Sequence, residues 1–346
     1  MLSDHMKKKK ALALLSGGLD STLAVKLLLE QGMQVEAINF VSPFCLCGKG
    51  GCGAPRVADR FDIPLKVVNV GEDYLRMVRK PKHGYGKNMN PCIDCRIFML
   101  RKAKKYAQET GASFIFTGEV LDERPMSQHI KALKIIEGEA GLKNRILRPL
   151  SAKLLPETSI EKRGLVDRGK LLDIRGRSRK RQIKLAKEFN IADYSCPAGG
   201  CLLTYKEFAD KVKDLFKHKK RVSMKDIALL KLGRHFRFGK DKIVVGRNEL
   251  ENKALLQMKL ASDYFFEVPN CGSPITILQG TKTKTAIEKA AALTAYYSDE
   301  KDAQVRVRFG KNSLDRIIDV FKPSQEEVEK LRITPKKSNC TSLTAF

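Results

Sequence analysis

Two groups of residues in this sequence could do chemistry: a glycine turn that carries an acid, and a set of clustered cysteines. The turn is Ser16-Gly17-Gly18-Leu19-Asp20-Ser21. Its glycines let the backbone approach a phosphate closely, the helix that follows presents unpaired N–H groups, and the serines add hydroxyl donors. A carboxylate among these donors would repel phosphate unless a divalent cation lies between them. The turn therefore predicts a nucleotide phosphate site with Mg²⁺ at Asp20.

The nine cysteines are the second chemical feature. An odd number argues against a complete disulfide framework, and clustered thiols in a reducing compartment more often hold metal or do chemistry. Cys92 and Cys95 lie in a proline-led turn at the start of a predicted helix, where we expect the helix N-terminus to lower the thiol pKa. Cys196 and Cys201 form a later pair. The others are assigned no role: Cys45, Cys47 and Cys52 in a glycine-rich loop, and the isolated Cys271 and Cys340.

The elements that would position these residues form repeated strand and helix units. Strands are predicted at 11–15, 35–41, 65–70 and 113–117, and helices after residue 18, at 54–61 and at 95–110. Such units predict a parallel sheet covered on both faces, with ligands at the carboxyl ends of its strands. After Gly200 the pattern changes. A basic helical stretch at 205–232 is followed by strands at 242–246 and 264–268, a helix at 285–297 and a last strand at 304–309.

The length of the chain indicates its domain organisation, and its charge indicates the kind of partner it binds. At 346 residues we expect two domains, a nucleotide domain with the cysteine site at 8–200 and a smaller α+β domain at 236–346, joined by a basic connector at 201–235. The net charge of +27 predicts a nucleic acid partner. No apolar run approaches the roughly 20 residues that cross a bilayer, so we expect a cytoplasmic protein without membrane contact. The sequence leaves a homodimer open.

The glycine turn resembles the PP-loop signature of the N-type ATP pyrophosphatase superfamily, whereas the GxxxxGK[ST] and GxGxxG patterns are absent there. The resemblance implies an α/β fold with an adenine nucleotide alpha hydrolase-like, Rossmann-like sheet. It also implies that ATP is cleaved between its α and β phosphates, with AMP passing to an oxygen. The further nucleotide-site residues that it implies are Asn39, Phe40, Gly118, Glu119, Arg124, Ser127, Gln128 and Arg148. Of these, Arg124 and Arg148 are expected to neutralise phosphate charge as pyrophosphate leaves.

The segment Asn90-Pro91-Cys92-Ile93-Asp94-Cys95 is similar to the NPC-x-x-C segment of the tRNA thiouridine synthetases in that superfamily. This implies that a uridine carbonyl is adenylated and its oxygen replaced by sulfur, which a sulfide or persulfide carrier supplies. Cys92 and Cys95 with either Cys196 or Cys201 would hold a [4Fe-4S] cluster, as in the cluster-dependent thiolases. A persulfide that a second cysteine resolves as a disulfide, and structural zinc on the same four cysteines, stay open.

Residues 236–322 resemble the NFACT-R RNA-binding domain, through Ile243-Val244-Val245-Gly246-Arg247-Asn248 and the later aromatic and alanine-rich segments. The resemblance implies that tRNA is held by its backbone and shape. Two competing functions stay open: an RNA-binding or ribosome-associated factor whose nucleotide domain has lost catalysis, and a PP-loop enzyme with a small-molecule acceptor. The sequence does not indicate which tRNA position, or which of carbons 2 and 4 of uridine, receives sulfur.

Overall fold

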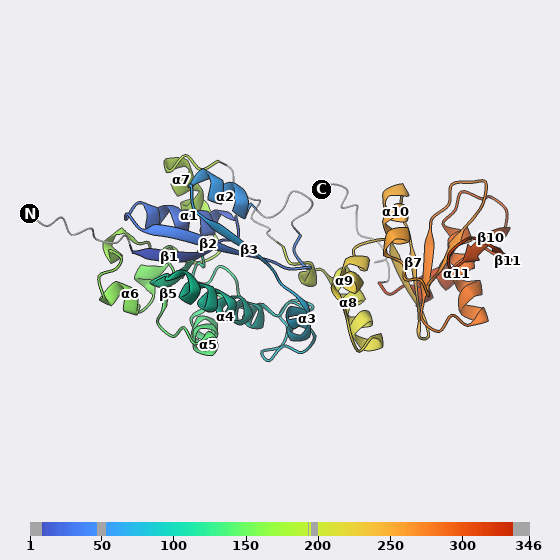
Figure 1. Ribbon diagram of the computed structural model, residues 1–346, viewed down its shortest axis with the longest axis horizontal. Helices are drawn as coiled ribbons and strands as arrows, with labels where there is room; N and C mark the ends of the chain where they lie inside the picture. Colours follow the sequence, from blue (N-terminus) through green and yellow to red (C-terminus); the bar gives the residue numbers. More distant parts are fainter. Residues whose placement is uncertain (1–8, 47–52, 193, 195–199, 335–346) are drawn as a thin grey trace, which may run out of the picture. The chain divides into compact units, whose positions relative to one another are not determined.

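The computed structural model describes residues 9–46, 53–192, 194 and 200–334. The chain divides into two compact units, Met1–Thr204 and Tyr205–Phe346 (Figure 1). The predicted connector, 201–235, is divided between them: residues 201–204 belong to the first unit, and the rest, which contains two helices, belongs to the second.

The first unit is built on a parallel sheet of five strands in the order β3-β2-β1-β4-β5. The strands are β1 (Lys10–Leu14), β2 (Gln34–Val41), β3 (Leu65–Asn69), β4 (Phe114–Thr117) and β5 (Ile146–Leu147). The chain runs outward from β1 to β3 and then returns to add β4 on the other side of β1. In sheets of this kind, ligands bind beyond the carboxyl ends of the strands where the order reverses. That point lies between β1 and β4, and the SGGLDS turn directly follows β1.

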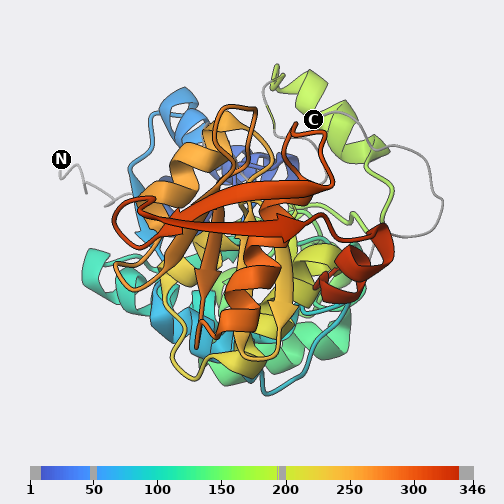
Figure 2. The ribbon, with the colours of Figure 1, turned by 90° about the vertical axis from the view of Figure 1, so that its right-hand side faces the viewer.

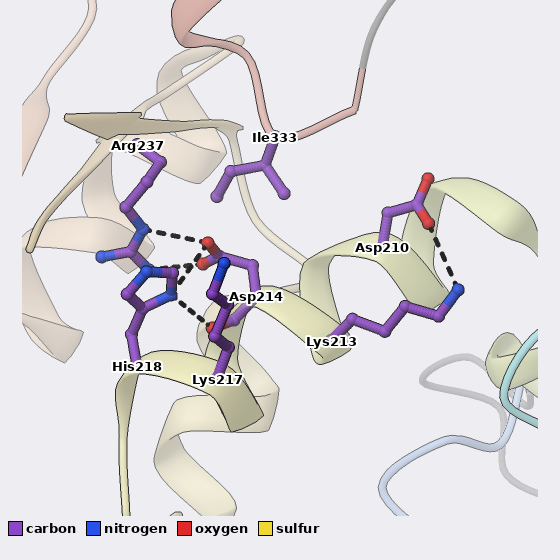
Figure 3. Close-up of a pocket in the computed structure, with 7 residues that line it drawn as sticks. All are labelled: Asp210, Lys213, Asp214, Lys217, His218, Arg237 and Ile333. Carbon is purple, nitrogen blue, oxygen red and sulfur yellow. Dashed lines mark hydrogen bonds and ion pairs between the residues drawn. The ribbon is translucent and has the colours of Figure 1, made fainter. Parts of the chain in front are cut away.

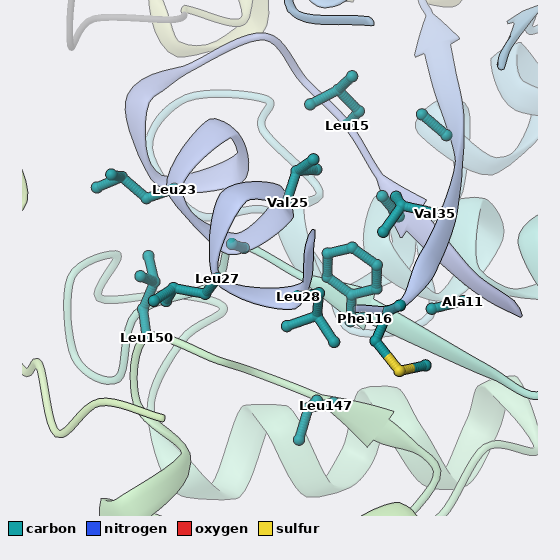
Figure 4. Packing of buried hydrophobic residues seen from close by; sticks show 14 of the residues in the cluster. Ala11, Leu15, Leu23, Val25, Leu27, Leu28, Val35, Phe116, Leu147 and Leu150 are labelled. Atoms are coloured by element: carbon teal, nitrogen blue, oxygen red, sulfur yellow. The ribbon is translucent and has the colours of Figure 1, made fainter. Parts of the chain in front are cut away.

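Helices cover both faces of this sheet, because side chains alternate between the two faces along β1. Ala11, Ala13 and Leu15 pack with α1, α2 and α7, whereas Leu12 and Leu14 pack with α4 and α5. Figure 4 shows Ala11 and Leu15 among the side chains of α1. The helices are α1 (Leu19–Leu29), α2 (Ala54–Arg60), α3 (Glu72–Arg79), α4 (Cys92–Thr110), α5 (Ile130–Ala140), α6 (Ser159–Lys162) and α7 (Lys180–Glu188). The predicted α/β class is confirmed. Neither α4, with 19 residues, nor any other helix in the described part of the chain has the length and apolarity to span a membrane.

The second unit contains an antiparallel sheet of six strands in the order β11-β10-β8-β9-β7-β6. The strands are β6 (Arg234–Phe238), β7 (Asp241–Val245), β8 (Tyr264–Glu267), β9 (Thr276–Gln279), β10 (Gln304–Gly310) and β11 (Arg316–Phe321). The helices are α8 (Lys206–His218), α9 (Met224–Leu229), α10 (Glu249–Met258), α11 (Lys284–Tyr296) and α12 (Gln325–Leu331). Helix α11 packs on one face of the sheet, and α9 and α10 pack over β7 and β9 on the other.

The prediction that the strand at 304–309 is the last one is wrong, because β11 follows it and pairs with it (Figure 2). Strand β11 lies at the edge of the sheet, and only Val320 among its residues is buried. Ile317 and Phe321 are exposed. An edge strand with one buried residue lacks the alternation of apolar and polar residues by which strands are predicted.

Candidate active site

The turn after β1 has the shape that its glycines predict. Gly17 has a φ of +75°, and a Cβ there would lie 2.2 Å from the backbone nitrogen of Ala54, so a larger residue would clash at this position. Gly18 is the N-cap of α1. The Ser21 hydroxyl donates to the Gly18 carbonyl at 2.9 Å, and the Ser16 and Ser21 hydroxyl oxygens lie 3.1 Å apart. The first N–H groups of α1 lack partners within the helix, so the turn can bind an anion.

Three other residues of the predicted nucleotide site support this turn. The side chain of Leu19 is fully buried in the core, so only its backbone can face a nucleotide. Asn39 is buried, and its amide nitrogen donates to the Leu15 carbonyl at 2.7 Å, which joins β2 to the end of β1. Phe40 is half-buried against the core beneath α4 and α5. Contact of Asn39 and Phe40 with adenine stays a prediction.

Asp20, the predicted Mg²⁺ ligand, is paired with an arginine that belongs to none of the predicted site segments. Arg179 donates through Nη2 to Asp20 Oδ2 at 2.7 Å, and its Nε lies 3.3 Å from Glu123 Oε1. Asp20 Oδ1 is buried and has no hydrogen-bond partner among the described residues. Burial raises the pKa of Glu123, and the neighbouring Asp20 carboxylate raises it further. Two carboxylates therefore lie close together beside the phosphate turn, with a single guanidinium between them.

Glu119 and Arg148 form a buried network at the carboxyl ends of β4 and β5. Their exposed fractions are 2 and 4%, and Arg148 Nε lies 3.0 Å from Glu119 Oε2. Arg148 also pairs with Glu137, and Arg96 Nε lies 3.4 Å from Glu119 Oε1. Burial alone would raise the pKa of Glu119, but the charges of Arg148 and Arg96 outweigh burial and lower the pKa. Two carboxylates thus already balance the Arg148 charge that was expected to neutralise phosphate.

Replacing Arg148 should destabilise the first unit strongly, because Arg148→Met leaves the carboxylates of Glu119 and Glu137 without their shared partner. Loss of one member of a buried ion pair costs about 3–5 kcal/mol. The free energy of unfolding, measured by urea titration with circular dichroism, should fall by that amount. Arg175→Met is the matched control, because Arg175 pairs with Asp122 at the surface, where loss of a pair costs about 0–1 kcal/mol. Equal losses for the two variants would contradict this account.

Two of the cysteines that the sequence singled out lie at the start of α4, and Cys201 lies near them. Cys92 and Cys95 occupy its first turn, and because α4 leads into β4, this turn lies at the carboxyl edge of the sheet. The Tyr74 hydroxyl lies 3.2 Å from Cys95 Sγ. Burial raises the pKa of Cys201 to about 12, and the nearby thiols of Cys95, Cys92 and Cys45 add to that shift. Four thiols from three segments of the chain therefore share one neighbourhood.

The expectation that the helix N-terminus lowers the pKa of Cys92 and Cys95 is wrong. Burial raises the pKa of both thiols. Arg96 opposes this rise at both thiols, as Arg124 does at Cys92, but neither outweighs burial. The dipole of a helix end acts within its first turn, whereas loss of water around the sulfur atom disfavours its charged form more strongly.

No three His, Cys, Asp or Glu side chains among residues 9–46, 53–192, 194 and 200–334 are close enough to hold one metal ion. Cys196, one of the two candidates for the third cluster ligand, lies outside the described residues, as do Cys47, Cys52 and Cys340.

The segment after β4 connects the phosphate turn to the thiols. A Cβ on Gly118 would lie 2.4 Å from the backbone nitrogen of Ser21, so the end of β4 touches the start of α1. The charge of Arg124 acts on Cys92 and also on Glu123, which neighbours Asp20. The phosphate turn and the cysteines therefore lie at the same edge of one sheet, with residues 118–124 between them.

The remaining residues predicted in this segment shape its turn. Arg124 is exposed, and its backbone N–H donates to Gln128 Oε1 at 2.9 Å. Ser127 and Gln128 are buried, and their backbone N–H groups donate to the Arg124 carbonyl at 3.3 and 3.0 Å. The side chain of Arg124 is thus exposed at this turn, together with that of Pro125.

Cys45 and Cys201 should form a disulfide when the protein is oxidised. They face each other in an isolated antiparallel β-bridge. The Leu46 N–H donates to the Gly200 carbonyl at 3.1 Å, and the Leu202 N–H donates to the Phe44 carbonyl at 2.7 Å. Because these hydrogen bonds join the neighbours, Cys45 and Cys201 are themselves a non-hydrogen-bonded pair. Such pairs have Cα atoms about 4.5 Å apart, within the roughly 4.4–6.8 Å that disulfides span. After treatment with diamide, non-reducing peptide mapping by mass spectrometry should find Cys45 joined to Cys201. A map in which Cys201 pairs only with Cys92 or Cys95 would contradict this register.

A cavity of about 440 Å³ lies in the second unit. Its lining comes mainly from α8, together with β6 and the segment after α12 (Figure 3). Asp214 accepts hydrogen bonds from Arg237 and lies 3.2 Å from the His218 ring, and Lys213 lies 3.8 Å from Asp210. The charged side chains are therefore largely paired with one another, and we assign this cavity no catalytic part.

Comparison with known proteins assigns a family to each of two segments. Residues 6–154 match the family model of the thiamine biosynthesis protein (ThiI), which covers the turn, Cys92, Cys95 and Arg148. The first unit contains a ThiI-family domain. Residues 233–332 match the model of the NFACT protein RNA binding domain, close to the segment that the sequence predicted. Both resemblances are thereby confirmed.

Curated relatives of the ThiI-family domain are tRNA-modifying enzymes. The tRNA-specific 2-thiouridylase MnmA of Syntrophotalea carbinolica is 35% identical over 125 residues, which are 32% of this chain and 35% of that protein. The MnmA of Clostridium botulinum strain Eklund 17B is 34% identical over 128 residues, 33% of this chain and 36% of the relative. This chain thus spans about a third of the length of the curated relatives that it matches.

Solved structures give a further likeness. A 4-thiouridine synthetase in complex with RNA and bound ATP is 25% identical, and the match covers 64% of this chain and 52% of that chain at a TM-score of 0.33. The U34-tRNA thiolase NcsA of Methanococcus maripaludis, solved with its [4Fe-4S] cluster, is 20% identical. That match covers 62% of this chain and 69% of that chain at a TM-score of 0.34.

Proposed function

We propose that this protein is an ATP-dependent tRNA sulfurtransferase that forms thiouridine, AMP and pyrophosphate. The observation that supports the proposal most is the meeting of a phosphate turn and a group of thiols at one edge of a sheet. One site of this kind can activate a carbonyl oxygen with ATP and then deliver sulfur to the carbon that bears this oxygen. The ThiI-family domain and the thiouridylase relatives support the same reaction.

The first step is adenylation. ATP lies on the turn after β1, and a uridine carbonyl oxygen attacks the α phosphorus, so that the bond to the β phosphate breaks and pyrophosphate leaves with its electron pair. The residues fit Mg²⁺, because Asp20 Oδ1 is buried without a partner among the described residues and Glu123 lies close by. Bound there, Mg²⁺ would neutralise phosphate charge. Backbone N–H groups of the turn and the exposed Arg124 would hold the phosphates.

In the second step, sulfide adds to the carbon that bears AMP, the bond from this carbon to oxygen breaks, and AMP leaves with the oxygen, so that a C=S bond remains. We propose that Cys92, Cys95 and either Cys196 or Cys201 hold a [4Fe-4S] cluster, because thiolates are the ligands that such clusters take. Such a cluster would supply one iron without a protein ligand, at which sulfide can bind. In the protein itself, Arg96 stabilises charge on Cys92 and Cys95, and the Tyr74 hydroxyl holds the Cys95 sulfur. The proposed donor is sulfide, or a persulfide carrier from which a second thiol releases sulfide and forms a disulfide.

The substrate that fits the rest of the chain is tRNA. The net charge of +27 and the match of residues 233–332 to an RNA binding domain support a polyanionic partner. A cytoplasmic location and a homodimer stay predictions.

The decisive assay supplies the protein with MgATP, sulfide and tRNA under anaerobic conditions. We expect pyrophosphate release that depends on tRNA, and thiouridine in the digested tRNA by mass spectrometry. Release that is indifferent to tRNA would instead indicate a small-molecule acceptor, and absence of release would indicate an RNA-binding factor. Measurement of iron and acid-labile sulfide after anaerobic reconstitution tests the cluster separately, since the persulfide route needs neither.

A further inference from the structure

Arg179 links α7 to the phosphate turn across 159 residues of sequence. It precedes α7, which lies beside α1 in Figure 1 and contributes Ala186 to the core that α1 shares. Its Nη2 donates to Asp20 Oδ2 at 2.7 Å, so the guanidinium lies one side chain away from the turn that would receive phosphate. A part for Arg179 in nucleotide binding rests on the proposed function, in which ATP binds at that turn.

Several polar atoms around this pair lack partners among the described residues. Arg179 Nη1 and Asp20 Oδ1 are buried without a hydrogen bond. Gln182, one helical turn further along α7, is fully buried, and neither its amide nitrogen nor its amide oxygen has a partner in the described part of the chain. Buried polar groups in native proteins nearly always bond to something, so a cluster of unsatisfied ones calls for a ligand or an ion. Here that ligand would contact both an acid and a guanidinium.

The charges explain which ligand fits. Asp20 and Glu123 together carry two negative charges if both are ionised, and Arg179 offsets one of them. A divalent cation on Asp20 competes with Arg179 for the same carboxylate. Once the cation takes that carboxylate, the guanidinium is left without its partner beside the phosphate turn. A guanidinium binds phosphate oxygens through two parallel N–H groups, so the triphosphate that arrives with the cation supplies a new partner.

We propose that Arg179 binds the β and γ phosphates of ATP, and afterwards the pyrophosphate, and that its pair with Asp20 is the resting arrangement that MgATP opens. The side on which it acts follows from its neighbours. The charges that act on Cys92 are those of Arg96 and Arg124, whereas Arg179 contacts Asp20 and Glu123. Arg179 therefore lies on the side of Asp20 and Glu123, where pyrophosphate would leave.

Equilibrium binding to the full chain, measured by calorimetry without tRNA, tests this assignment. Arg179→Gln should weaken MgATP and magnesium pyrophosphate roughly 10- to 100-fold, the loss expected for charge-assisted hydrogen bonds. AMP, which lacks the β and γ phosphates, should keep its affinity within about twofold. Arg179→Lys, which keeps the charge but not the paired donors, should recover part of the loss for ATP. Arg181→Gln is the control, since Arg181 is exposed and pairs with Asp173.

A different pattern would overturn the assignment. If Arg179 only fastens α7 to α1, Arg179→Gln will lower the melting temperature and weaken AMP and ATP equally, or leave both unchanged. The binding of ATP is measured without tRNA or sulfide. If the wild-type protein binds MgATP but forms no thiouridine, the proposed function is refuted, whereas this inference still stands. Loss of ATP and pyrophosphate affinity alone supports Arg179 as a phosphate ligand.

Discussion

Replacing Asp20 with asparagine should reduce tRNA-dependent release of pyrophosphate about 10³-fold, because the variant loses the carboxylate proposed to bind Mg²⁺. Neutralisation of phosphoryl charge by a metal ion contributes several kcal/mol to such a transition state, and each 1.4 kcal/mol is about a tenfold change in rate. The asparagine side chain has nearly the same size and can still accept a hydrogen bond from Arg179. Pyrophosphate release from labelled ATP, with saturating tRNA, is the measurement.

Asp122→Asn is the control for this prediction. Asp122 lies next to Glu123 in the chain, but it pairs with Arg175, at 2.7 Å, rather than with Arg179. Its rate should stay within about twofold of the wild-type rate, since surface ion pairs contribute little. A rate for Asp20→Asn that matches that of Asp122→Asn would remove Asp20 from the catalytic site.

Replacing Cys92 or Cys95 with alanine should abolish thiouridine formation while leaving the adenylation step active. The thiols belong to the sulfur step, and residues 118–124 lie between them and the adenylation residues. We therefore expect less than about 1% of the wild-type thiouridine, together with a pyrophosphate burst and tRNA that carries AMP. Nucleoside mass spectrometry measures the first, and a rapid-quench assay with ATP labelled at the α phosphate measures the second.

Cys271→Ala is the matched control, because Cys271 belongs to the second unit, whereas Cys92 and Cys95 belong to the first. It should retain full activity. Thiouridine formation by Cys95→Ala at the wild-type rate would contradict a part for the CxxC segment in sulfur transfer. Loss of the pyrophosphate burst as well, in a variant that is folded, would mean that the thiols are needed for adenylation.

The sequence predicted those parts of the site that depend on local chemistry. The shape of a glycine turn between a buried strand and a helix depends on local chemistry, so the turn at 16–21 and the parallel sheet could be predicted. The pairing of Arg179 with Asp20 could not, because it joins residues far apart in a run of arginines with similar side chains. Glu123 was missed for the same reason, since only the fold brings it to Asp20.

Long-range packing also decided the features that the sequence misjudged or left open. The pKa of Cys92 and Cys95 is raised rather than lowered because the fold buries both sulfur atoms, which the position of a helix start does not reveal. Arg148 stays a predicted phosphate ligand, and its two carboxylate partners, Glu119 and Glu137, come together only in the folded protein. Cys45 was assigned no role from the sequence, because only the fold pairs its backbone with that of Cys201 in an isolated β-bridge.

The central claim is that the phosphate turn and the thiols of one chain act on the same bound uridine. A mixing experiment tests it most directly: Asp20→Asn and Cys95→Ala, each inactive alone, are combined with MgATP, sulfide and tRNA. Because the adenylated base should stay in the site where it forms, we predict that the mixture makes no more thiouridine than either variant. Recovery of a substantial fraction of wild-type thiouridine would contradict the account, since the two steps would then occur at separate sites.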